Sequence, residues 1–138
     1  MEQDEMKAVA RRFFEEVWNQ GKLEVIDEIY AKDCSLNGRL MGSAGIKQFI
    51  GMFRTGFPDI HLSIEEQAVD GNRLVTRTRS QGTHQGKFMG MPATDKRIDI
   101  GAITISRFID GIIVEEWEYN DGLGLYRQIG VIPSRGKG

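Results

Sequence analysis

Cysteine and histidine are scarce in this sequence. Cys34 is the single cysteine, so no disulfide can form within the chain. His61 and His84 are the two histidines, and together with one cysteine they are too few for a zinc site built from His and Cys ligands. A lone cysteine in an apolar stretch is most often a small core residue. We therefore expect no metal and no other cofactor.

The sequence also lacks a long apolar run and an excess of either charge. No stretch approaches the roughly 20 apolar residues of a membrane-spanning helix. The first residues are acidic, where a signal peptide would be basic and then apolar. The net charge is −2 without a basic stripe, which argues against nucleic-acid binding. We expect a cytoplasmic protein that binds neither membranes nor nucleic acids.

What remains is the composition of an ordinary folded domain. The chain has 138 residues, of which 40% are hydrophobic and 28% are charged. We predict a single domain over residues 1–133. The small, charged tail at residues 134–138 is expected to fray.

The first half of the chain has the apolar spacing of helices. Helices are predicted at residues 6–18, 23–30 and 43–53, because apolar side chains recur there every three or four positions. Ser43 is the expected N-cap of the third helix. Pro58 prevents that helix from continuing.

The second half alternates apolar and polar residues with a period of two, which is typical of strands. Turn signals separate the predicted strands, which lie at about residues 60–64, 73–84, 97–109 and 112–120. Helices followed by hairpin-linked strands are typical of the α+β class. Long strands twist, so we predict a cone, in which a curved antiparallel sheet and three N-terminal helices enclose one pocket.

The Asp110-Gly111 turn predicts which side chains share a face of the sheet. A two-residue loop pairs Ile109 with Ile112, and opposed residues lie on the same side. Strict alternation then predicts the pocket face, which carries Ile100, Ala102, Thr104, Ser106, Phe108, Ile113, Glu115, Trp117, Tyr119 and Asp121. The outer face would carry Ile103, Ile105, Arg107, Val114, Glu116 and Glu118. Its isoleucines could seal a homodimer or a larger homo-oligomer.

For the preceding hairpin we favour a three-residue loop at residues 70–72. Leu62 then opposes Ser80 on the pocket side, and Ile64 opposes Thr78 on the same side. A two-residue loop would turn both apolar side chains outward, beside the arginines of the next strand. The longer loop keeps the apolar residues together.

Asp121 is the first candidate for a catalytic residue. A carboxylate in an apolar site loses hydration, which suits it to take a proton from an acidic carbon or to give one to an oxyanion. The alternative is that Asp121 caps the turn at residues 121–124 by accepting hydrogen bonds from backbone N–H groups. Both roles can coexist.

Other residues are candidates for a second catalytic role or for substrate binding. His84 is a possible acid/base or donor to a substrate carbonyl, although a histidine at a strand end is more often structural. Asn37, in an Asn-Gly turn, could donate at the pocket mouth. The remaining substrate-binding candidates are expected in the pocket wall: Phe14, Trp18, Tyr30, Phe53, Phe88, Thr104, Trp117 and Tyr119. For the helical aromatic residues, a plain core role is the alternative.

Three functional hypotheses follow from a pocket that holds an acid. The first is a cofactor-independent acid/base enzyme that abstracts a proton from carbon in a small apolar carbonyl or ester substrate. The second is a non-catalytic module for small-molecule binding or dimerisation. The third is epoxide hydrolysis or ketosteroid-isomerase-like chemistry, which requires additional pocket carboxylates or a tyrosine donor.

Four segments, taken in order, resemble the SnoaL-like polyketide cyclases, also called ester cyclases. They are residues 14–21 (FEEVWNQG), 82–92 (GTHQGKFMGMP), 107–117 (RFIDGIIVEEW) and 121–130 (DGLGLYRQIG). The resemblance implies the nuclear-transport-factor-2-like cone, often dimeric or tetrameric. It also implies closure of a ring in a polyketide ester by intramolecular aldol condensation, without cofactor or metal. The acid/base of the family is an aspartate, and the resemblance assigns that role to Asp121.

Overall fold

The computed structural model describes residues 1–133, so the predicted fraying of residues 134–138 lies outside the described residues. The helical elements are α1 (Gln3–Arg12), the π-helix η1 (Phe13–Asn19), the 3-10 helix η2 (Leu23–Val25), α2 (Ile26–Ile29), α3 (Gly42–Gly56) and α4 (Gly122–Gln128). The strands are β1 (Tyr30–Leu36), β2 (Arg39–Leu40), β3 (His61–Asp70), β4 (Arg73–Thr83), β5 (Arg97–Ile109) and β6 (Ile112–Asn120). They form one six-stranded sheet in the order β2-β1-β6-β5-β4-β3.

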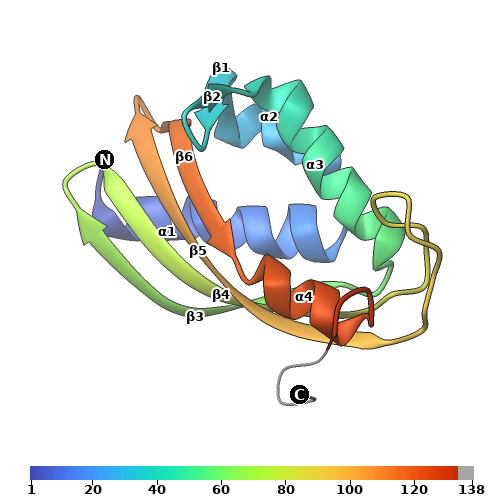
Figure 1. Ribbon diagram of the computed structural model, residues 1–138. Helices are drawn as coiled ribbons and strands as arrows, with labels where there is room; N and C mark the ends of the chain where they lie inside the picture. Colours follow the sequence, from blue (N-terminus) through green and yellow to red (C-terminus); the bar gives the residue numbers. More distant parts are fainter. Residues whose placement is uncertain (134–138) are drawn as a thin grey trace.

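The sheet curves around the N-terminal helix, as Figure 1 shows, and α3 lies across the open side of the curve. This arrangement confirms the predicted α+β cone. One part of the prediction is wrong, because β1 pairs with β6 in parallel and the sheet is therefore not wholly antiparallel. The strand β1 occupies residues that follow the predicted second helix, and a register shift between Tyr30 and Ser35 breaks the alternation by which a strand is recognised.

The N-terminal helix changes its winding where it meets the sheet. After Arg12 the chain continues as the π-helix η1, which buries Phe13, Phe14, Val17 and Trp18. π-helical turns are rare and are frequently found at functional sites. Here two adjacent aromatic residues, Phe13 and Phe14, are both buried at the start of the π-helix.

The third helix starts differently from the prediction. It begins at Gly42, and Ser43 lies inside it without capping its N-terminus. Its predicted end before Pro58 is confirmed, since α3 stops at Gly56.

The β3–β4 hairpin contains a β-bulge. Its loop has two residues, because Asp70 pairs with Arg73, and the predicted three-residue loop is wrong. The register then shifts between Ile64 and Glu66. The extra residue at this bulge compensates for the shorter loop. Beyond the bulge the predicted pairs are therefore found, so that Leu62 opposes Ser80 and Ile64 opposes Thr78.

The β5–β6 hairpin also contains a bulge, and here it reverses the prediction. The Asp110-Gly111 loop and the pairing of Ile109 with Ile112 are confirmed. Next to them, however, Phe108 pairs with Ile113 whereas Arg107 pairs with Glu115, and the intervening Val114 has no partner in the ladder. One extra residue moves every later side chain of β6 to the opposite face.

The faces of β5 agree with the prediction. Ile100, Thr104 and Ser106 are buried on the concave side, whereas Ile103 is 46% exposed on the outer side. The faces of β6 beyond the bulge are inverted. Thr104 pairs with Glu118 instead of Trp117.

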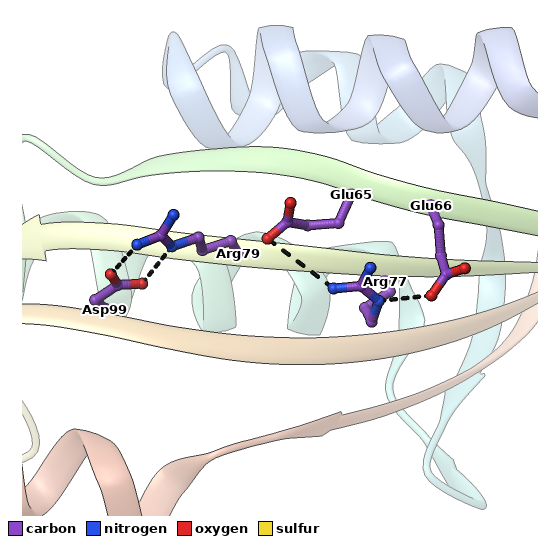
Figure 2. A network of polar contacts seen from close by, with 5 residues as sticks. All are labelled: Glu65, Glu66, Arg77, Arg79 and Asp99. Carbon is purple, nitrogen blue, oxygen red and sulfur yellow. Dashed lines mark hydrogen bonds and ion pairs between the residues drawn. The ribbon is translucent and has the colours of Figure 1, made fainter.

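Ion pairs cover much of the outer face of the sheet (Figure 2). Arg77 lies beside Glu65 and Glu66, and Arg79 binds Asp99. Each of these side chains is substantially exposed, so each pair contributes little to the free energy of folding. The arginines of β4 thus point away from the concave side. Within residues 1–133, no helix is long and apolar enough to cross a membrane.

Candidate active site

A pocket lies between the concave face of the sheet and the helices. The helical wall is mostly aromatic and consists of Phe13, Phe14, Trp18, Phe49 and Phe53 together with Ile46 and Ile50. The sheet contributes aliphatic and small polar side chains, which include Ile98, Ile100, Ala102 and Thr104. The empty volume, counted with the open mouth, is about 680 Å³. The pocket is therefore large enough for a small, mostly apolar molecule.

Two acids and one amide reach the pocket from the inner face of β6. Glu116, Glu118 and Asn120 all line it, and no Lys, Arg or His is among the lining residues. Exposure rises along this row, since Glu116 is 6% exposed, Glu118 is half-buried and Asn120 is exposed. Glu116 thus marks the deep end and Asn120 the mouth.

The buried carboxyl group of Glu116 accepts hydrogen bonds from two hydroxyl groups. The Tyr30 hydroxyl donates to Oε1 at 2.7 Å, and the Ser106 hydroxyl donates to Oε2 at 2.7 Å. Burial raises the pKa of Glu116 from 4.5 to about 7, while the two hydroxyl hydrogen bonds oppose that rise and the charge of Glu118 adds to it. A carboxyl group with this pKa can hold or release a proton near neutral pH.

The neighbours of Glu116 on β1 stay neutral. Tyr30 is 2% exposed and packs edge-on against Phe13 with ring centroids 5.4 Å apart. Burial, and then the charge of Glu116, raises the pKa of Tyr30 well above its usual value. Burial likewise raises the pKa of the Cys34 thiol, which is consistent with a core role for Cys34.

Glu118 is held both at its side chain and at its backbone. Burial raises its pKa, and the Asn120 amide donates to Oε1 at 3.1 Å. The Asn37 side-chain amide pairs with the backbone of Glu118, donating to its C=O at 3.0 Å and accepting from its N–H at 2.7 Å. Asn37 therefore extends the pairing of β1 with β6 beyond Leu36. Its predicted donation into the pocket mouth is wrong, because its side chain faces the Glu118 backbone and Asn37 is not among the residues that line the pocket.

Asp121 lies outside the pocket, and its predicted inward orientation is wrong. The bulge at Val114 turns the last residues of β6 around, and Asp121 borders a shallow hollow on the outer side of the sheet. Its Oδ1 accepts a hydrogen bond from the Gly124 N–H at 2.9 Å at the start of α4. The capping alternative for Asp121 is therefore confirmed.

The two aromatic residues of β6 are also on the outer face, for the same reason. Tyr119 is 65% exposed. Trp117 is half-buried beside the Asn37-Gly38 turn, where a Cβ added at Gly38 would lie 3.3 Å from the indole ring. The prediction that Trp117 and Tyr119 line the pocket is wrong.

The segment that follows β4 places His84 and Phe88 in the core instead of the pocket. His84 is 0% exposed, its Nδ1 lies 3.0 Å from the Thr94 hydroxyl, and its Nε2 has no hydrogen-bond partner within residues 1–133. Phe88 is 2% exposed and packs on Phe53 and Phe57 with centroids 5.0 and 5.2 Å apart. Neither residue lines the pocket, and Tyr30 reaches it only through Glu116.

Four of the predicted substrate-binding residues do line the pocket, namely Phe14, Trp18, Phe53 and Thr104. The sequence prediction missed Glu116 and Glu118, because strict alternation turns both of them outward and puts Trp117 and Tyr119 inside. A bulge leaves no mark in such a pattern. Among the described residues, no group of three or more His, Cys, Asp or Glu side chains could hold a metal ion.

Comparison with known proteins extends these observations. The sequence profile of the family described as SnoaL-like polyketide cyclase matches residues 8–129. The chain is 30% identical over 122 residues to the aklanonic acid methyl ester cyclase DnrD of Streptomyces peucetius, covering 83% of this chain and 84% of that protein. It is 28% identical over 120 residues to the nogalonic acid methyl ester cyclase of Streptomyces nogalater, covering 82% and 89%.

A solved structure has the same fold. TsrD from Streptomyces laurentii superposes with a TM-score of 0.88 at 24% identity, over 96% of this chain and 99% of that chain. The named relatives are cyclases, which are enzymes. The profile match, the relatives and the fold agree, and the chain belongs to the SnoaL-like polyketide cyclase family.

Proposed function

We propose that this protein is a cofactor-independent ester cyclase in which Glu118 is the general base. The observation that carries the proposal is a half-buried carboxylate in a largely apolar pocket without a lining cation. Such a group is poorly hydrated, so it binds a proton more readily than a carboxylate in water. The cyclase names of the relatives support the same reaction class.

The reaction begins with proton transfer from carbon. Glu118 takes the proton from the carbon next to the ester carbonyl, and the C–H electron pair becomes that of an enolate. The enolate carbon then attacks a second carbonyl carbon of the same molecule and forms the new C–C bond. The displaced π pair moves to that carbonyl oxygen, which takes a proton back from Glu118. Substrate and product are isomers, and no electron acceptor is required.

The charge of the pocket favours an ester over the corresponding free acid. Glu116 and Glu118 both line the pocket, and none of its lining residues is basic. A substrate carboxylate would bring a further negative charge into an apolar site without a partner. We therefore propose a neutral, flat, aromatic ester as the substrate class, and the methyl esters of aklanonic and nogalonic acids as the first substrates to assay.

A pair of isosteric substitutions tests the assignment. Glu118→Gln removes the base and is expected to lower the rate of ring closure by roughly 10²–10⁴-fold. Asp121→Asn changes a residue outside the pocket and is expected to leave that rate within a few fold. Ring closure is followed by chromatography, and uptake of solvent deuterium at the carbon next to the ester reports the first step separately. Full activity of Glu118→Gln together with loss of activity in Asp121→Asn would show that Asp121 is the general base.

The pocket also supports a second candidate, a ketosteroid-isomerase-like activity. That chemistry needs a carboxylate base together with an acid or tyrosine donor. Glu118 and Glu116 both line the pocket, and Tyr30 hydrogen-bonds Glu116. Conversion of a β,γ-unsaturated ketone into its conjugated isomer, seen as new ultraviolet absorbance and lost in Glu118→Gln, would favour this candidate. Saturable binding of both substrates without any turnover would favour a binding module.

A further inference from the structure

We propose that Glu116 acts as a neutral carboxylic acid that donates a hydrogen bond to the carbonyl oxygen of the bound substrate while Glu118 takes the proton from the neighbouring carbon. This inference rests on the proposed function, because it assigns the second acid of the same pocket. It makes Glu116 the group that stabilises the negative charge of the enolate oxygen.

The spacing of the two acids fits a hydrogen-bond donor at one position and a general base at the other. Glu116 and Glu118 occupy alternate positions of β6, so both point to the pocket and their Cα atoms are separated by roughly 6–7 Å. That span accommodates a carbonyl group and its neighbouring carbon, with one polar contact at each end. The carbonyl would lie toward the buried Glu116 and the acidic carbon toward the half-buried Glu118.

The surroundings of the two acids favour a protonated Glu116 and an ionised Glu118, as these two roles require. Glu116 is 6% exposed and has no cationic partner among residues 1–133, and the hydroxyl hydrogen bonds from Tyr30 and Ser106 offset only part of the effect of burial. Glu118 is half-buried near the mouth, with an amide N–H donor from Asn120. Burial without a cation favours the neutral form of Glu116 more strongly than that of Glu118.

The two acids also bias one another. The charge of Glu118 raises the pKa of Glu116, so an ionised base favours a protonated partner. The other titratable groups near Glu116 are Tyr30 and Cys34 of β1, and burial raises the pKa of both. The lining residues from η1, α3 and β5 are uncharged. The pair is thus arranged to hold one proton, and Glu116 is the better place for it.

A bound carbonyl probe tests the donation without any turnover. Methyl 2-naphthoate, a neutral aromatic ester, is titrated into the protein, and the infrared C=O band of the bound ester is recorded at about pH 5.5 and about pH 8.5, on either side of the pKa of Glu116. We expect a band shifted to lower frequency at the acidic pH and a smaller shift at the alkaline pH. Ionised Glu116 has no proton to donate.

Substitutions identify the donor. Glu116→Gln keeps an N–H donor that does not titrate, so the pH dependence of the band should vanish. Tyr30→Phe removes a hydrogen bond that favours ionised Glu116, so the midpoint of the band shift should move to higher pH. Glu115→Gln, on the outer face beside Arg107, is the matched control and should behave as the unmodified protein.

Each negative result has a distinct meaning. A band that does not change with pH in the unmodified protein overturns the inference, and so does Glu116→Gln with an unaltered pH dependence. Absence of saturable ester binding at the acidic pH overturns it as well. Failure of the proposed function would appear in a different assay, as deuterium uptake that is retained in Glu118→Gln. That result would not change the infrared band of the bound ester.

Discussion

Glu116 links the pocket to the stability of the fold. Its pKa is raised from 4.5 to about 7, so between these pH values the folded protein keeps a proton that the unfolded chain has released. The free energy of unfolding therefore falls as the pH rises through this window and levels off above it. The shift corresponds to roughly 3 kcal/mol, at about 1.4 kcal/mol for each pKa unit.

We expect Glu116→Gln to remove most of this pH dependence. The glutamine has nearly the same shape and no proton to lose, so its unfolding free energy should change little between about pH 5 and about pH 8. Urea denaturation at the two pH values measures the difference. Glu115→Gln, at the half-buried neighbour on the outer face, should retain the slope of the unmodified protein, and an equal slope in Glu116→Gln would contradict a buried titrating carboxyl at this position.

Asn37 is a positioning residue for Glu118. Its side chain makes two hydrogen bonds to the Glu118 backbone, and its φ of 53° lies in the left-handed region. Asn37→Ala should lower the free energy of unfolding by about 1–3 kcal/mol, at about 0.5–1.5 kcal/mol for each hydrogen bond. Asn37→Gly relieves the backbone strain but also loses the amide. Urea denaturation of both variants separates the two causes, and equal stability of Asn37→Ala and the unmodified protein would show that the amide is dispensable.

At the scale of elements, an asparagine amide also joins the π-helix to the sheet. Asn19, the last residue of η1, donates to the C=O of Leu62 at 3.0 Å and accepts from its N–H at 2.8 Å. Leu62 lies on β3, the edge strand, so Asn19 satisfies backbone groups that no further strand can pair. The helix and the strand edge are therefore tied at the rim of the pocket.

Asn19→Ala is expected to loosen this edge. Loss of two partially buried hydrogen bonds should cost about 1–3 kcal/mol of unfolding free energy and accelerate exchange of the Leu62 amide hydrogen. Hydrogen exchange by mass spectrometry, read on peptides covering β3, measures the effect. Asn72→Ala in the adjacent hairpin turn offers a comparison substitution. Unaltered exchange of Leu62 in Asn19→Ala would mean that water replaces the amide without cost.

Element types were largely predictable from the sequence, whereas the faces of β6 were not. Helical spacing identifies the N-terminal helix and α3, and Asp110-Gly111 correctly predicts the last hairpin. The two bulges follow from sheet curvature and long-range pairing, which local alternation does not contain. In one hairpin the bulge compensated a wrong loop length, and in the other it turned the predicted catalytic aspartate outward.

At the scale of the whole molecule, the outer face of the sheet stays a predicted contact surface between copies of the chain. Ile103 is 46% exposed there and Tyr119 is 65% exposed, and Trp117 adds a half-buried aromatic side chain to the same side. Aromatic residues are enriched at interfaces between proteins. The ion pairs around Arg77 and Arg79 would form the polar rim of such a contact.

Ile103→Glu tests this contact. A charge in the centre of an apolar interface should shift the protein from dimer towards monomer, because the charge loses its hydration without gaining a partner. Light scattering coupled to size-exclusion chromatography measures the mass. Ile109→Glu, which alters an equally exposed isoleucine at the hairpin tip, is the control. A monomeric unmodified protein would contradict the prediction.

The unpaired Val114 shows that a single residue decides which side chains of β6 line the pocket. Without that one unpaired residue, the same strand would present an indole and a phenol to the ligand and turn Glu116 and Glu118 to the outer face. A length change of a single residue near this hairpin can therefore switch a relative from an acidic to an aromatic wall while most of its amino acids stay the same. Relatives of this chain are better compared by strand register than by residue type when their acids and bases are assigned.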